Sequence, residues 1–215
     1  MRIAILTSAR SGSTSLYHLI EKHLLPQKYI CISEPFNNFW RDKIGLPTYD
    51  TDFFVDKENI FVKTFVSKNQ KPKSLEDNED EYWKWFFGYF DKVILLNRLN
   101  KDLQSESLTF HMKSNDIHSW QKKQFYDLSN ISKEEIENSK QVLIKEFETL
   151  NWVYKMGYPM FDFEDIFIKK DKSVVEEIFS YINVDLKNPL YESIIKSDLY
   201  RVRVGSGEER FKGLI

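Results

Sequence analysis

Short apolar runs alternate with longer segments of helical spacing along most of the chain. Five runs predict buried strands, at residues 2–7, 28–33, 60–66, 92–96 and 160–163. Apolar residues recur at helical spacing over residues 14–25, 81–90, 101–113, 132–156 and 172–182. Strands that alternate with helices are typical of a parallel sheet covered on both faces. We therefore expect an α/β fold of three αβα layers, in one domain over residues 1–215, because no linker or internal repeat divides the chain.

Local signals refine three of these segments. Ser132 and Glu135 form a capping-box pattern at the start of the longest helix, and we expect its charged residues as far as Glu148 to lie in solvent. The aromatic residues of 82–90 recur at helical spacing and are expected to pack in the core. Residues 67–80 are polar and contain a proline, which predicts an exposed loop and a candidate lid.

Composition limits the classes of function that the chain can have. Its 215 residues are 41% hydrophobic, which suits one domain with a substantial core. The formal net charge is −2, so there is no global basic field for nucleic acid, and any anion site must be local. Cys31 is the single cysteine, which excludes an internal disulfide and favours a reducing, cytoplasmic location; its apolar neighbours predict burial. No apolar stretch is long enough to span a membrane.

A loop of small residues joins the first predicted strand to the first predicted helix. It comprises Ser8, Ala9, Arg10, Ser11, Gly12, Ser13, Thr14 and Ser15. Small residues let the backbone approach an anion closely, and the helix N-terminus presents N–H groups with a positive dipole end. The hydroxyl groups and Arg10 add donors and positive charge. The pattern predicts a site for a phosphate or phosphosulfate group, with an ordinary serine-capped helix start as the alternative.

The loop differs from the common triphosphate-binding loop, whose pattern is G-x-x-x-x-G-K-[ST]. The first glycine is missing, and no lysine precedes Ser13 or Thr14. Enzymes with that loop also need an acid for Mg²⁺ after a later apolar strand. Here Asn97 and Arg98 follow the run 92–96. A cation at that position predicts a second anion site and argues against a metal-dependent kinase.

Taken in order, these motifs resemble the sulfotransferases that use 3′-phosphoadenosine-5′-phosphosulfate (PAPS). Arg10 to Thr14 (RSGST) is similar to the 5′-phosphosulfate loop of that family. The family's 3′-phosphate motif is an arginine that ends a central strand, followed by a serine on the next helix. The pattern R-x-N-x-x-x-Q-x-x-S of the bacterial glycolipid-type members fits Arg98, Asn100, Gln104 and Ser107. Residues 163–166 and 176–182 resemble two later pieces of the family.

The resemblance implies a P-loop-like sulfotransferase fold and an enzyme that uses PAPS without a metal and releases adenosine 3′,5′-bisphosphate. It implies that the residues from Arg10 to Ser15 hold the 5′ end of the nucleotide, and that Arg98 holds the 3′-phosphate together with a serine. Cytosolic animal-type members place that serine eight residues after the arginine. That position here is a glutamate between Ser105 and Ser107. Both serines are candidates, and Ser107 is preferred.

The resemblance also implies the catalytic residues. The animal-type members carry K-T-H on the third strand, with the histidine as base, whereas residues 63–65 read K-T-F, and Phe65 cannot accept a proton. Other branches of the family use a glutamate after the second strand, and Glu34 stands in a similar E-P-F context. We therefore expect Glu34 to be the general base and Lys63 to stabilise the charge on the transferred sulfuryl group.

Several alternatives stay open. His111 and His118 are further candidates near the acceptor, and the segment from Arg201 to Gly207 loosely resembles a late basic loop that closes over the nucleotide. A P-loop-type nucleotide or sugar kinase and a catalytically inactive nucleotide-binding module are the alternative functions. The acceptor is expected to be a small molecule, a glycan or a lipid with a hydroxyl or amine group. The sequence identifies neither the acceptor nor the oligomeric state.

Overall fold

The computed structural model describes residues 1–37, 41, 45–47, 49–67, 70–114 and 131–194. Its centre is a five-stranded sheet of β1 (Arg2–Thr7), β2 (Ile30–Ser33), β3 (Ile60–Phe65), β4 (Lys92–Asn97) and β5 (Met160–Asp162). The strand order is β2-β3-β1-β4-β5, and every neighbouring pair is parallel. The five predicted strands and the parallel sheet are therefore confirmed.

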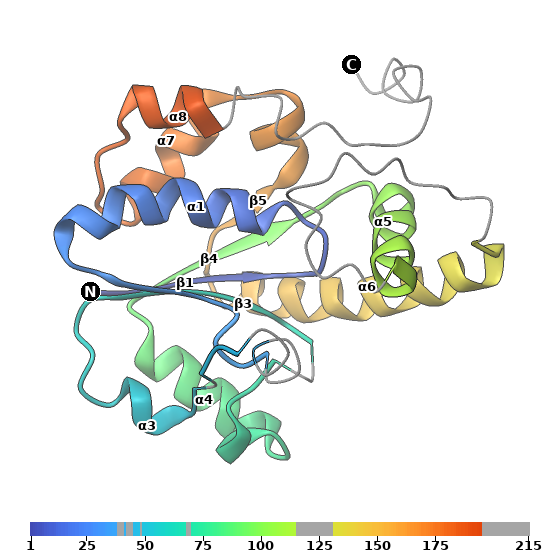
Figure 1. The fold of residues 1–215 in the computed structure, drawn as a ribbon, viewed down its shortest axis with the longest axis horizontal. Coiled ribbons are helices and arrows are strands. Elements are labelled where there is room, and N and C mark those ends of the chain that lie inside the picture. Colours follow the sequence, from blue (N-terminus) through green and yellow to red (C-terminus); the bar gives the residue numbers. More distant parts are fainter. Residues whose placement is uncertain (38–40, 42–44, 48, 68–69, 115–130, 195–215) are drawn as a thin grey trace.

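Helices cover both faces of this sheet (Figure 1). The α-helices are α1 (Ser13–Leu24), α3 (Thr51–Phe54), α4 (Glu79–Tyr89), α5 (Lys101–Ser114), α6 (Lys133–Lys155), α7 (Lys172–Tyr181) and α8 (Asn188–Ile194). Shorter helical turns are η1 (Leu25–Gln27), η2 (Lys73–Leu75) and the π-helical η4 (Glu164–Ile168). The five predicted helices are present with ends that differ by one or two residues, and Ser132 and Glu135 form the predicted capping box. The unpredicted elements are short, so they carry little periodic signal.

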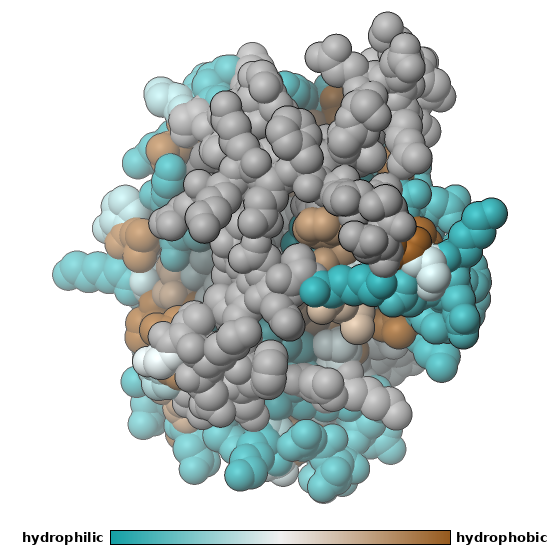
Figure 2. Space-filling view, turned by 45° about the vertical axis from the view of Figure 1, so that its right-hand side comes forward, coloured by the Kyte–Doolittle hydropathy of each residue, from teal (hydrophilic) through white to brown (hydrophobic). Residues whose placement is uncertain are grey.

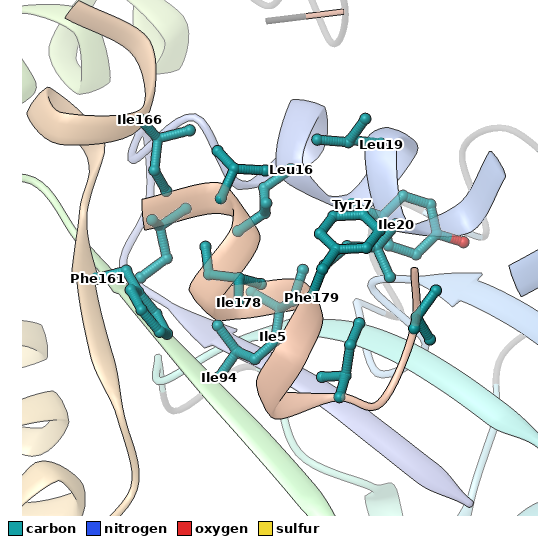
Figure 3. Packing of buried hydrophobic residues seen from close by; sticks show 14 of the residues in the cluster. Ile5, Leu16, Tyr17, Leu19, Ile20, Ile94, Phe161, Ile166, Ile178 and Phe179 are labelled. Carbon is teal, nitrogen blue, oxygen red and sulfur yellow. The ribbon is translucent and has the colours of Figure 1, made fainter. Parts of the chain in front are cut away.

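Two hydrophobic clusters hold the three layers together. On one face, Ile5 and Ile94 of the strands pack against α1, α7 and η4, as Figure 3 shows around Leu16, Ile178 and Phe179. On the other face, strand residues pack against the aromatic side chains of α4 and against the second half of α6. The buried aromatic residues of α4 confirm the prediction that this segment belongs to the core. Among the described residues, no helix is both long enough and apolar enough to cross a membrane.

Three expectations about exposure are wrong at particular residues, although most of residues 73–80 and most charged residues of α6 are exposed as predicted. Gln70 and Lys71 are buried instead of lying in an exposed loop, and the Lys71 amine lies 5.3 Å from the centre of the Tyr82 ring. Glu146 is buried although the charges of its helix were expected in solvent, because its side chain faces the loop after β1. Cys31 is only partly buried, since β2 is an edge strand, and burial raises the pKa of its thiol to about 12.

Candidate anion-binding site

The topology brings the sequence motifs to one edge of the sheet. From β1 the chain passes by α1 to the β2–β3 side of the sheet, and from β3 it passes by α4 to β4 on the other side of β1. The order therefore reverses between β1 and β4, and ligands of open α/β sheets bind outside the carboxyl ends of strands at such a point. The loop after β1 and the turn after β4 both lie at this edge, where α5 begins (Figure 1).

The surface on this side of the molecule carries mainly hydrophilic side chains at its rim, with separate hydrophobic patches between them (Figure 2). A hollow lies at the opposite end of the sheet, at the amino ends of the strands. It is lined by Met1, Arg2, Lys57, Asp91 and neighbouring residues. It contains none of the candidate site residues. The candidate site therefore rests on the loop, on the strand ends and on the contacts between them.

The loop after β1 leaves the N-terminus of α1 open to an anion. Arg10 and Gly12 both adopt left-handed backbone conformations, with φ of 60° and 76°. Gly12 is the N-cap of α1; it offers no side chain to cap the helix, and the first turn contains no acidic residue. The N–H groups of the first turn thus keep the partial positive charge that suits a phosphate or sulfate group.

Gly12 is required by packing as well as by backbone conformation. A Cβ atom at this position would lie 2.6 Å from Cδ2 of Phe163 and 2.9 Å from Cε2 of Phe167. Both distances are far shorter than an ordinary van der Waals contact. The left-handed φ adds backbone strain for any residue other than glycine. Phe163, which belongs to the segment 163–166 that resembles the family, therefore packs directly against the loop, and so does Phe167.

Most serines of the loop face inward. Ser11 and Ser13 are buried, and the Ser11 hydroxyl makes a short contact with the Thr7 hydroxyl. Ser15 is half-buried on the first turn of α1. The Thr14 hydroxyl accepts a hydrogen bond of 3.2 Å from the Lys63 amine. The serines thus shape the loop, while its backbone and Thr14 line the open end.

Lys63 and Glu34 form a buried ion pair beside the loop. The Lys63 amine lies 2.7 Å from Oε1 of Glu34, and the Lys63 side chain is 1% exposed. Burial lowers the pKa of Lys63, the Glu34 carboxylate opposes that shift, and the positive charge of Arg10 adds to it. Lys63 is therefore a buried lysine and not a surface residue at the end of its strand. The structure brings together the two residues expected to be catalytic, and it joins them to Thr14.

Glu34 owes its position to an unusual turn at the end of β2. Its backbone is left-handed, with φ of 53°, and its N–H donates to the Lys63 carbonyl at 2.7 Å. The Asn37 amide donates to its carboxylate at 2.9 Å. Arg41, which sequence reasoning missed, is buried and donates from Nη1 to the Ser33 carbonyl at 3.1 Å. Arginine is scarce in this chain, and that scarcity is the signal that could have drawn attention to Arg41.

Arg98 lies on the other side of the loop, at the end of β4. Its Nη1 donates to the Arg10 carbonyl at 3.2 Å, and its guanidinium lies 4.7 Å from the centre of the Phe163 ring. The Glu164 carboxylate accepts the N–H groups of Leu99 and Asn100 at 2.9 and 3.0 Å. The late segment at 163–166 therefore supports both motifs, because Phe163 contacts Arg98 and Glu164 holds the turn that follows it.

Two residues of α5 connect this turn to the loop. Gln104 donates from Nε2 to the Ser8 hydroxyl and to the Ala9 carbonyl. Lys101 donates to the side chains of Asn97 and Gln104 and to the Arg98 carbonyl, and burial lowers its pKa to about 8. Gln104 belongs to the pattern noted in the sequence, whereas Lys101 was missed because lysines are common in this chain.

Glu146 of α6 also holds the loop after β1 in place. Its Oε2 accepts the Ala9 N–H at 3.0 Å, and burial raises the pKa of its carboxyl group. The sequence contained a signal for this position. Leu143, Leu150 and Val153 are buried on α6, and Glu146 lies on the same stripe by helical spacing. A charged residue on an apolar stripe requires a specific partner.

The two candidate serines of α5 lie in different surroundings. Ser105 is fully buried, and its hydroxyl donates to the Asp102 carbonyl of its own helix at 2.8 Å. Ser107 is half-buried and accepts a hydrogen bond of 3.0 Å from Nε of Arg10. The structure therefore brings Ser107, Arg10 and Arg98 together and turns Ser105 away.

Three further candidates came from the sequence, and the structure describes one of them. His111 is half-buried and follows Ser107 by one turn of α5. His118 and the segment from Arg201 to Gly207 lie outside the described residues. The described site thus has two halves, with Glu34 and Lys63 on one side of the loop and Arg98 and Ser107 on the other.

Comparison with known proteins yields similar structures but no similar sequence family. No protein-family model matches the chain, and no curated protein matches it. A sulfotransferase domain from the curacin biosynthetic pathway is 17% identical, with a TM-score of 0.48 over 88% of this chain and 76% of that chain. The sulfotransferase domain from the Synechococcus PCC 7002 olefin synthase is 15% identical, with a TM-score of 0.45 over 95% of this chain and 80% of that chain. The function proposed below is based on the site and not on these likenesses.

Proposed function

We propose that the chain is a sulfotransferase that moves a sulfuryl group from PAPS to a hydroxyl or amine acceptor. The observation that supports this proposal best is the arrangement around one uncapped helix N-terminus. A lysine–carboxylate pair, Lys63 and Glu34, lies on one side of the loop, and an arginine–serine group that includes Arg98 and Ser107 lies on the other. A donor with a phosphosulfate at one end and a separate phosphate at the other requires two anion sites of this kind.

The residues fit the donor by their chemistry. The N–H groups at the start of α1 and the Thr14 hydroxyl would hold the 5′-phosphosulfate, and Lys63 is close enough to Thr14 to share that charge. Arg98 and Ser107 would hold the 3′-phosphate. No acid follows β4 for a metal ion, since Asn97 and Arg98 occupy that place. That feature disfavours the alternative of a Mg²⁺-dependent kinase.

Glu34 would act as the general base in the transfer. Its carboxylate takes the proton of the acceptor hydroxyl while the acceptor oxygen forms a bond to sulfur. The bond between sulfur and the bridging phosphate oxygen breaks, and adenosine 3′,5′-bisphosphate leaves. Lys63, already within 2.7 Å of Glu34, stabilises the negative charge that develops on the bridging oxygen. Glu34 follows the last residue of β2 and has a left-handed backbone, so the strand does not continue through it. Its carboxylate lies beside the Lys63 amine.

The proposal includes a cytoplasmic location, which rests on the single cysteine, and an acceptor that is a small molecule, a glycan or a lipid. It includes no nucleic-acid partner, because the net charge is −2. A catalytically inactive nucleotide-binding module remains the alternative that shares the same binding site.

A thermal-shift comparison tests the donor. Adenosine 3′,5′-bisphosphate should raise the melting temperature, since a ligand at 100 times its Kd adds about 2.7 kcal/mol of stability. ATP with Mg²⁺ should have a much smaller effect, and the reverse order would indicate a kinase. Transfer of radioactive sulfate from labelled PAPS to a panel of alcohols, glycans and lipids then separates an enzyme from an inactive module.

A further inference from the structure

We propose that Arg41 is a positioning residue for Glu34, because it fixes the turn after β2 that holds the Glu34 carboxylate beside the Lys63 amine. This inference rests on the proposed function, in which Glu34 is the general base. Arg41 is given no contact with the donor or the acceptor. It acts on Glu34 through the main chain and through Asn37.

The Arg41 side chain fastens the residue before Glu34 to a later part of the chain. Its Nη1 donates at 3.1 Å to the carbonyl of Ser33, the last residue of β2, and its Nε makes a short hydrogen bond to the Pro47 carbonyl. The guanidinium also lies 4.6 Å from the centre of the Tyr49 ring. Arg41 is only 5% exposed. Arginine suits this place, because its planar fork donates in fixed directions and stacks on aromatic rings.

The main chain of Arg41 makes a second connection to Glu34. The Arg41 N–H donates to the Asn37 carbonyl at 2.9 Å. The Asn37 N–H in turn donates to the Glu34 carbonyl at 3.2 Å, and the Asn37 side-chain amide donates to Oε2 of Glu34 at 2.9 Å. Arg41 therefore reaches Glu34 by two routes, one through the Ser33 carbonyl and one through Asn37.

Glu34 needs such restraint because of its own conformation. Its backbone is left-handed, with φ of 53°, which is unfavourable for a residue with a Cβ atom. A conformation of this kind persists only where the surrounding contacts determine it. Oε1 of Glu34 lies 2.7 Å from the Lys63 amine, and Oε2 is bonded to Asn37. A rotation of the turn would therefore move both carboxylate oxygens away from their partners.

The charge of Arg41 fits the same role. Burial lowers the pKa of the guanidinium, and the nearby Tyr49 and Glu34 act in the opposite direction. The negative charge of Glu34 therefore stabilises the buried cation. Arginine stays protonated in proteins, so a second positive charge lies in the neighbourhood of the carboxylate, in addition to that of Lys63.

Hydrogen exchange tests the positioning before any acceptor is known. Amide exchange is followed by NMR in the wild type and in Arg41→Met, which keeps much of the apolar volume but loses the donors. The Glu34 and Asn37 amides should exchange faster by about tenfold or more, the scale of a lost hydrogen bond to a charged group. The amides of β1 should keep their protection, since β3 separates that strand from β2. Unchanged exchange at Glu34 and Asn37 would overturn the inference.

Turnover tests the consequence for catalysis, with an acceptor found in the panel of alcohols, glycans and lipids. Arg41→Met should lower kcat by about tenfold to a hundredfold, because a displacement of about 1 Å can cost about 10²-fold. The Kd of adenosine 3′,5′-bisphosphate should change by less than about threefold. Arg41→Lys keeps the charge without the planar fork and should retain part of the turnover. It also serves as the second variant if Arg41→Met does not fold.

Arg2→Met is the matched control. Arg2 also lies over a tyrosine ring, that of Tyr89, at a distance of 4.9 Å from the ring centre. It stands at the start of β1, at the end of the sheet opposite to Glu34. This substitution should leave kcat, nucleotide affinity and the exchange of the Glu34 amide unchanged.

A double-variant cycle separates a positioning role from a merely structural one. In the Glu34→Gln background, Arg41→Met should cause little further loss of kcat, because no base remains to be positioned. If the two losses multiply, Arg41 acts independently of Glu34 and the inference is wrong. The inference is also wrong if Arg41→Met weakens nucleotide binding as much as it lowers kcat.

The outcomes distinguish the inference from the proposed function. If Glu34→Gln lowers turnover and Arg41→Met does not, the inference fails while the proposed function stands. If the wild type transfers no sulfuryl group, or if Glu34→Gln keeps full turnover, the proposed role of Glu34 fails, and the inference fails with it.

Discussion

Replacing Gly12 by alanine is expected to destabilise the protein and to disturb the anion loop. Two costs add at this position. The left-handed backbone costs a residue with a Cβ atom about 1–2 kcal/mol. The new methyl group would also lie 2.6 Å from the Phe163 ring and 2.9 Å from the Phe167 ring, and overpacking of this kind costs about 1–3 kcal/mol. The expected loss of unfolding free energy is therefore about 2–5 kcal/mol.

The rings have little freedom to move away from the added methyl group. Phe163 is 5% exposed and lies beneath the Arg98 guanidinium, with the Phe167 ring centre 5.1 Å from its own. Relief of the clash therefore requires a shift of the loop or of Arg98. We expect the affinity for adenosine 3′,5′-bisphosphate to fall as well, because both anion sites border this contact.

Gly157 provides a matched control for the backbone cost alone. It also has a left-handed backbone, with φ of 99°, but an added Cβ would meet no atom within 4 Å. Gly157→Ala should therefore cost about 1–2 kcal/mol and leave nucleotide affinity unchanged. Urea unfolding with linear extrapolation measures both variants. If Gly12→Ala costs no more than Gly157→Ala, the packing of Phe163 and Phe167 on the loop is not as described.

The remaining predictions concern single side chains. Glu34→Gln should lower turnover by about 10²–10⁴ while nucleotide affinity stays within a small factor, and unchanged turnover on an identified acceptor would exclude Glu34 as the base. Arg98→Ala should remove the preference for adenosine 3′,5′-bisphosphate over the monophosphate in calorimetry, and a retained preference would place the 3′-phosphate elsewhere. Glu146→Ala should cost about 1–3 kcal/mol in urea unfolding because the Ala9 N–H loses its acceptor, whereas Glu146→Gln keeps an acceptor oxygen and should cost less; equal losses would contradict this role. Burial lowers the pKa of His23, so the unfolded chain binds its proton more readily, and stability should fall as the pH drops below about 6.5; a His23→Gln variant with the same pH dependence would refute the assignment.

The candidate site could be predicted from the sequence where its parts are contiguous. The residues from Arg10 to Thr14 form one loop between a strand and a helix, and Arg98 follows an apolar run, so both were recognisable as local patterns. Glu34 and Lys63 were inferred from resemblance, and the structure brings them within 2.7 Å. Glu146 was not predicted because the loop that it holds is distant in sequence, and Arg41 was not predicted because the residues around it form no motif.

The sequence by itself determined the strands, the main helices and the parallel sheet, because hydrophobic periodicity and capping are local properties of the chain. Only the tertiary structure decided which residues meet. It placed Ser107 beside Arg10, whereas the Ser105 hydroxyl is bonded to a carbonyl of its own helix. It also buried Lys63 beside Glu34 and set Phe163 against Gly12. These contacts depend on strand order and helix packing, which join segments separated by many residues and leave no periodic signal in the sequence.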